Sequence, residues 1–263
     1  MRSISGKRLI VGIGALLLMC SGSSHANEWE WNITPYLWAP SVGMDLTVAD
    51  QSLGGEADFT DLIDKVDSVF MGHFEGRKDR WGFYLDTIYM KLKDNNTVAV
   101  GPGGPILGDL TANAALKMKI YDMGAMVRVN DSESDVRVDI LGGLRYVDMD
   151  IETIIGLPGP QQGQVDIQAG PSETDMMLGA RAMGNFNERW HWGVRGDVSY
   201  LGTDGTFNAL AAVGYTFGQS GLFSLDLGYR YMTIKLDGST DRGAPISSKV
   251  TMSGPVLGFA FNF

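Results

Sequence analysis

The sequence predicts an all-β protein, a closed antiparallel transmembrane β-barrel of about ten strands. Three observations support this prediction. From Glu28 onward, apolar and polar residues alternate with a period of two in runs of about ten to fourteen residues. Aromatic residues stand at both ends of several runs, and the connections between runs are alternately short and long. These features are typical of barrels that cross a membrane.

The alternation is clearest in the C-terminal third of the chain. From 222 to 235 one face is apolar, and the other carries polar residues such as Ser224 and Asp226. The same pattern occurs from 190 to 201 and from 207 to 217. A helix would need a period of 3.6, which these segments lack, so they are predicted to be strands. Soluble strands usually run about five or six residues, so these strands are long.

A soluble β-sandwich would also alternate, because it buries one apolar face and exposes a polar one. The ends of the runs favour the barrel, since girdles of aromatic residues mark membrane boundaries. The paired aromatics are Trp81 and Tyr89, Trp190 and Tyr200, and Phe207 and Phe217. Bacterial barrels also have short periplasmic turns and longer external loops. The short connections are 78–80, 130–134, 187–189 and 218–220, and the long ones are 95–109, 155–171 and 237–247.

The alternation of short and long connections predicts ten strands, and an even number of strands places both termini in the periplasm. The segment 42–49 also alternates, but an eleventh spanning strand would break the parity, so we assign it to the first outer loop. Eight or twelve strands remain compatible with the pattern. The connection at 203–205 is shorter than expected for an outer loop. The predicted strands are 29–39, 68–77, 81–93, 112–129, 135–151, 173–186, 190–202, 205–217, 221–236 and 248–263.

The first outer loop is predicted to contain a short amphipathic helix. Phe59, Leu62, Ile63 and Val66 recur at helical spacing, and Asp58 stands at the N-cap position. Such a helix covers the barrel mouth or lies at the membrane interface. Packing against the barrel is the more common reason for an apolar stripe of this kind.

Residues 1–26 have the order of a secretory signal peptide, in which basic residues precede an apolar run and small residues follow it. We place the cleavage after Ala26, which leaves residues 27–263 as one transmembrane β-barrel domain. The basic residues are Arg2, Lys7 and Arg8, the apolar run is 9–19, and the small residues lie in 21–26.

The single cysteine, Cys20, offers an alternative interpretation of this segment as a lipoprotein anchor. Met19 precedes it, where the lipoprotein pattern has Gly, Ala or Ser. Cleavage after Ala26 removes the cysteine, so the mature chain can form neither a disulfide framework nor a cysteine-based zinc site.

The charge argues against nucleic acid as a partner. The chain has 21 Lys and Arg against 31 Asp and Glu, a net charge of −10, and loss of three basic residues with the signal peptide makes it −13. No basic surplus exists to neutralise phosphates. Beyond the N-terminal run, no apolar stretch approaches the ~20 residues of a spanning helix. We expect no cofactor and no metal site, because no zinc-like His spacing and no calcium-loop spacing occur.

The last residues place Phe259, Phe261 and Phe263 on one face and end the chain in Phe. This ending resembles the terminal signature of Gram-negative outer-membrane β-barrel proteins. The resemblance implies location in the outer membrane after export through the periplasm, and recognition of the three phenylalanines by the barrel-assembly machinery. It also implies contact with outer-membrane lipids and lipopolysaccharide. A closer resemblance, to a group of uncharacterised small barrels, lies in 35–38, 70–75 and 81–83.

The face opposite the apolar one carries seven acidic and seven basic residues. An arginine facing lipid at mid-depth would cost about 2–4 kcal/mol, so we expect these residues to face the barrel interior. There they either fill and stiffen a narrow barrel or line a small polar pore. Ten strands lie nearer to eight, which side chains fill, than to the sixteen of open porins. The predicted lumen charge network comprises Glu75, Arg77, Asp86, Asp122, Arg128, Arg137, Asp139, Arg145, Asp175, Arg181, Arg195, Asp197, Asp226 and Arg230.

We expect a non-enzymatic outer-membrane barrel that is structural or forms a narrow pore for small polar solutes. An importer of small hydrophobic compounds is the second hypothesis. Apolar loop tips at 101–107 and 154–160 favour it, and the charged lumen opposes it.

A lipid-modifying outer-membrane enzyme is the third hypothesis, and it needs a nucleophile beside a base. His73 with Glu75, or His191 with Ser199, would have to supply the chemistry. Both histidines lie near the periplasmic turns, whereas lipopolysaccharide lies in the outer leaflet. We therefore predict that the protein is not an enzyme.

Overall fold

The structure is a computed structural model of the whole chain. It describes residues 29–48, 51–94, 111–130, 134–156, 164–169, 172–218, 220–239 and 245–263. The predicted signal peptide, the loop tip 101–107 and most of the tip 154–160 lie outside the described residues.

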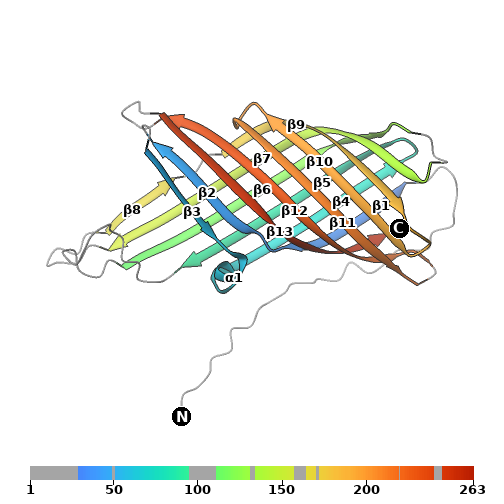
Figure 1. Cartoon of the computed structure of the whole chain (residues 1–263), viewed down its shortest axis with the longest axis horizontal. Helices are drawn as coiled ribbons and strands as arrows, with labels where there is room; N and C mark the ends of the chain where they lie inside the picture. The colour runs from blue at the N-terminus through green and yellow to red at the C-terminus, as the bar shows by residue number, and fades with distance from the viewer. Residues whose placement is uncertain are drawn as a thin grey trace, which may run out of the picture.

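Ten of the described strands form a closed antiparallel ring, which confirms the predicted fold and strand number. Each strand pairs with its neighbour in sequence, and the first and last strands close the ring through pairs such as Leu37 with Leu257. Figure 1 shows these strands running obliquely around one barrel. The ring contains β1 (Glu30–Trp38), β4 (Val66–Lys78), β5 (Trp81–Asp94), β6 (Thr111–Arg128), β7 (Val136–Gly156), β9 (Ser172–Asn185), β10 (Trp190–Tyr200), β11 (Gly205–Phe217), β12 (Phe223–Ser239) and β13 (Pro245–Asn262).

The two ends of the barrel differ. At one end, hereafter the short-turn end, the strands are joined by the connections 79–80, 129–135, 186–189 and 218–222, and both Trp29 and Phe263 lie there. At the other, hereafter the long-loop end, the strands are joined by 39–65 and by the segments that begin after Asp94, Gly156 and Ser239, and β8 lies there, on the left in Figure 1. This is the alternation that the sequence predicts.

Three further strands extend the wall at the long-loop end. β2 (Ser41–Val48) pairs with the outer part of β13, and β3 (Gln51–Ala57) pairs with β2. The segment 42–49 is thus part of the first outer loop, as predicted, but it forms a hairpin. The predicted long connection at 155–171 contains a further strand, β8 (Gln164–Ala169), which pairs with β7. The long strands β7 and β13 extend beyond their neighbours β9 and β1, and the edges left unpaired there bind the additional strands.

The predicted helix is present but one residue shorter than the apolar spacing suggests, and its second half is a 3₁₀ turn. It comprises α1 (Phe59–Leu62) and a 3₁₀ turn, η1 (Ile63–Lys65), after which Val66 already belongs to β4. Leu62 packs against the buried apolar cluster of the barrel interior. Asp58 stands at the N-cap, but its side chain makes no capping hydrogen bond and instead accepts one from the Ser41 hydroxyl at 3.3 Å.

The outer wall of the barrel is apolar. Large apolar side chains are exposed on it, for example Phe70, Trp81 and Leu227, which are 64%, 66% and 62% exposed. An apolar belt of this size is the surface that lipid covers in transmembrane barrels. Among the described residues, no helix is long and apolar enough to cross a membrane.

The interior has two layers of different chemistry. Toward the short-turn end it holds charged side chains, whereas the half toward the long loops is filled by a methionine-rich apolar cluster. The alternation of polar and apolar residues did not predict this apolar layer, because apolar side chains here lie on both faces of the strands. The cluster comprises Tyr36, Trp38, Met71, Ile88, Met90, Leu92, Met118, Ile120, Val147, Met149, Met232, Ile234, Val250 and Met252.

The seam between β1 and β13 contains a gap in its ladder. Its paired residues skip Thr34 and Pro35, since proline has no N–H to donate. The ladder between β11 and β12 runs without interruption from Gly205 to Phe217. The N–H groups of Trp31 and Ala39 point toward β13, so that of Thr34 points toward β4, and the amide that faces the gap is that of Phe259 on β13. We therefore expect amide hydrogen exchange at Phe259 to be up to about tenfold faster than in the middle of β11, which corresponds to one missing hydrogen bond. Exchange measured by mass spectrometry on the detergent-solubilised barrel tests this, and equal protection along both seams would contradict it.

Candidate functional site

A large cavity opens at the short-turn end of the barrel. Its volume is about 1300 Å³, and side chains from the turns and from both termini line its rim. Nine residues of the predicted lumen charge network line this cavity: Glu75, Arg77, Asp86, Arg128, Arg137, Arg181, Arg195, Asp226 and Arg230. The other five are buried in the barrel interior: Asp122, Asp139, Arg145, Asp175 and Asp197.

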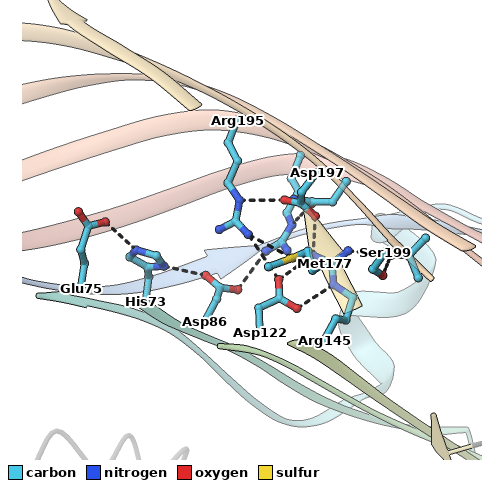
Figure 2. Close-up of polar contacts among 12 residues, drawn as sticks. His73, Glu75, Asp86, Asp122, Arg145, Met177, Arg195, Asp197 and Ser199 are labelled. Carbon is cyan, nitrogen blue, oxygen red and sulfur yellow. Dashed lines mark hydrogen bonds and ion pairs between the residues drawn. The ribbon is translucent and has the colours of Figure 1, made fainter. Parts of the chain in front are cut away.

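Arg145 is the centre of the deeper layer and is 0% exposed. Its guanidinium donates two hydrogen bonds to the Asp122 carboxylate, both at 2.7 Å, and a third to Asp197 at 2.7 Å. A fourth reaches the Thr206 hydroxyl at 2.8 Å. Figure 2 shows Arg145 beside Asp122, with Asp197 and Arg195 above them. Side chains from β6, β7, β10 and β11 therefore meet on one guanidinium, which closes the middle of the barrel.

A chain of hydrogen bonds continues from this centre to the opposite wall. Asn208 donates to Asp197 at 2.8 Å and accepts from Arg230 at 2.8 Å. Arg230 in turn donates to the Tyr36 hydroxyl at 3.1 Å, and that hydroxyl donates to Asp86 at 2.8 Å. The layer thus reaches β1 and β5, so polar bonds cross the whole interior.

A second cluster lies nearer to the short-turn end and is built on Asp139, which is 0% exposed. Three arginines donate to its carboxylate: Arg77 at 2.6 Å, Arg181 at 2.9 Å and Arg128 at 3.1 Å. Arg181 also donates to the Glu75 carboxylate, at 2.6 Å for one of two bonds. Strands β4, β6, β7 and β9 are connected through this cluster.

Asp175 explains why the outer connection at 201–204 is so short. Its carboxylate accepts hydrogen bonds from the backbone N–H groups of Gly202 and Thr203, at 2.9 and 2.7 Å. The hydroxyls of Thr203 and Ser199 donate to its second oxygen, at 2.6 and 2.8 Å. One buried carboxylate therefore satisfies the turn that joins β10 to β11, and no longer loop is required.

The two histidines are bound to carboxylates. His73 lies between Asp86 and Glu75, at 3.2 and 3.5 Å, as Figure 2 shows. His191 contacts Asp226 at 2.7 Å, and its other ring nitrogen lies 3.4 Å from the Thr216 hydroxyl.

The suggested pairing of His191 with Ser199 is wrong. The two residues lie on the same strand, about 26 Å apart at the rise of an extended chain. Ser199 is instead hydrogen-bonded to Asp175 and Thr206 at the far end of that strand.

No group of three or more His, Cys, Asp or Glu side chains that could hold a metal ion occurs among the described residues. Most carboxylates of the interior accept hydrogen bonds from arginine, which leaves them poorly placed to bind a cation.

Sequence reasoning missed the neutral members of the network. Tyr36, Thr206 and Asn208 connect the charged residues, and Trp38 packs its ring under Arg230 at 5.1 Å. Alternation along the strand could have placed two of them in the interior, because Thr206 and Asn208 lie on the strand face opposite to the exposed Phe207. The alternation does not indicate which charged residue each of them contacts.

No family model matches the chain, and no curated protein matches it. Among solved structures, the outer-membrane protease OmpT from Escherichia coli aligns with a TM-score of 0.53 at 9% identity, covering 92% of this chain and 99% of that chain. The fold is that of a Gram-negative outer-membrane β-barrel. Ail from Yersinia pestis aligns with a TM-score of 0.33 at 12% identity, covering 89% of this chain and 99% of that chain. A Pseudomonas aeruginosa FadL homologue aligns with a TM-score of 0.35 at 8% identity, covering 90% of each chain. At such identities the similarity of this chain to OmpT concerns the fold alone.

Proposed function

We propose that this chain is a structural, non-enzymatic outer-membrane barrel whose membrane-spanning part is closed to ions. The observation that carries this proposal is the burial of side chains from every barrel strand in the interior above the cavity. Each of the ten barrel strands contributes at least one inward side chain that is at most 9% exposed. One such residue from each strand, in ring order, is Tyr36, Met71, Ile88, Ile120, Val147, Met177, Asp197, Thr206, Met232 and Met252.

The two layers oppose different solutes. A hydrated ion would have to displace the apolar cluster around Met232 and Met252, both 0% exposed, without any polar partner there. A hydrophobic compound could share the apolar layer but would next meet the network around Arg145, where every displaced hydrogen bond leaves a buried charge. This arrangement favours the structural barrel over the narrow pore and over the hydrophobic importer.

Planar-bilayer recording of the purified, refolded protein tests the proposal. We expect no steady ion current at either polarity after insertion has been verified. An open porin added afterwards to the same bilayer shows that the assay detects channels. Stable unitary currents from the barrel itself would refute the closed lumen.

The outer surface supports the proposed partners. Phe259, Phe261 and Phe263 are 53%, 36% and 48% exposed at the end of the last strand, so an assembly factor can contact them. We propose that they serve as the signal for the barrel-assembly machinery. We also propose that the apolar belt contacts outer-membrane lipids, with lipopolysaccharide at the long-loop end.

A further inference from the structure

One wall of the cavity at the short-turn end gathers four arginines. They are Arg77, Arg128, Arg137 and Arg181, on strands β4, β6, β7 and β9. Asp79 and Asp86 also line this side, so with Glu75 and Asp139 its formal charge is 4 − 4 = 0. Glu75 and Asp139 are the two carboxylates that pair with these arginines.

Glu75 and Asp139 already accept as many hydrogen bonds as their oxygens can hold. One oxygen of Asp139 accepts from Arg128 and Arg77, at 3.1 and 3.3 Å, and the other accepts from Arg77 and Arg181, at 2.6 and 2.9 Å. Glu75 accepts two bonds from Arg181 and lies 3.5 Å from His73. Neither group has capacity for a further guanidinium.

Arg137 is the arginine without a partner. It lies on β7 two residues before Asp139, on the same face and nearer to the cavity mouth, and its side chain is exposed. Its guanidinium has no hydrogen-bond or ion-pair partner within the part of the chain that the structure describes. Arg128 beside it uses only Nε, so both of its terminal nitrogens are also available there. Two guanidinium groups thus present free donors to a cavity of about 1300 Å³.

Partial burial removes water from the Arg137 guanidinium, the like charges of Arg128 and Arg77 repel it, and Asp139 and Glu30 attract it without a hydrogen bond. An oxyanion would supply the acceptors that its N–H groups lack. A planar guanidinium with five donors matches the two oxygens of a carboxylate or phosphate group, which it binds in a bidentate manner.

We propose that this wall, with Arg137 and Arg128 as its recognition residues, is a binding site for an oxyanion that enters from the short-turn end, preferably a phosphoryl group. Two sources offer this chemistry on that side of the membrane: a soluble phosphorylated solute and a phospholipid headgroup. The site does not depend on whether the barrel conducts ions, so its test and the bilayer recording can fail separately.

Isothermal titration of the full barrel in a non-ionic maltoside detergent tests the site. Inorganic pyrophosphate represents the soluble source, and dihexanoyl phosphatidylglycerol represents the headgroup. We expect saturable binding of one of them to one site, weakened by added salt. Arg137→Gln should raise the Kd about tenfold or more, since a charge-assisted hydrogen-bond pair is lost.

The matched control is Arg189→Gln. Arg189 is an exposed arginine on the turn at the same end, but it lies outside the cavity and donates to the Tyr215 hydroxyl at 3.0 Å. Its replacement should leave the Kd unchanged. Binding of pyrophosphate assigns the site to soluble anions, and binding of the lipid alone assigns it to headgroups. The proposal would be overturned if neither probe bound, or if Arg137→Gln and Arg189→Gln raised the Kd equally.

Discussion

Replacement of Arg145 by Met is expected to destabilise the barrel by about 3–5 kcal/mol, the cost of removing one partner from a buried ion pair. Asp122 would lose the most hydrogen bonds, because both of its close ones come from Arg145. The next guanidinium, that of Arg195, lies 3.7 Å away. Asp197 would keep its bonds from Arg195 and Asn208. Methionine has a similar length, so the expected loss reflects the orphaned carboxylate rather than a large void.

Urea unfolding in detergent, followed by tryptophan fluorescence and by the heat-dependent shift on electrophoresis gels, measures this loss. The double variant R145M/D122N should recover most of it, because the neutral amide no longer needs a cation. Arg189→Met, on the exposed turn, should change the unfolding free energy by less than about 0.5 kcal/mol. If R145M unfolds at the same urea concentration as the parent, the Arg145 layer does not support the barrel.

Replacement of Gly143 by Ala is expected to prevent β6 and β7 from pairing at mid-strand, at a cost of about 3 kcal/mol or more. A Cβ atom at Gly143 would lie 2.1 Å from the Met123 carbonyl oxygen and 2.7 Å from the Cα atom of Gly124. Both contacts are with backbone, so no side-chain rotation can relieve them. The strands would have to separate locally, in the same region where Asp122 binds Arg145.

The adjacent glycine provides the control. A Cβ atom at Gly142 would have no atom within 4 Å, so Gly142→Ala should leave the barrel intact. Refolding yield and urea midpoint of the two variants can be compared directly, since they add the same methyl group at neighbouring positions. Equal behaviour of G142A and G143A would show that the close approach of β6 and β7 is not required.

Much of the fold could be predicted because its signals are local. Alternation with a period of two is read within one strand, and the even strand count follows from alternating short and long connections. The alternation of polar and apolar residues also placed the charged residues on one face, although it did not identify their partners. The hairpin β2–β3 and strand β8 were harder to predict, since short segments become strands only when a longer strand offers them an edge.

The pairing within the interior could not be predicted in this way. Arg181 and Glu75 are 106 residues apart in sequence, and Arg230 and Tyr36 are 194 apart. Their contacts depend on the register of several strands and on distances across the closed ring, which no single segment encodes.

The sequence by itself thus determined the barrel, its two faces and the set of charged residues on the inner one, because side-chain direction along a strand follows from covalent geometry. Only the tertiary structure decided which charges meet, where methionines replace them, and that Arg137 faces a cavity with no partner among the described residues. Those outcomes depend on ring closure, since closure alone brings side chains from opposite walls within hydrogen-bonding distance.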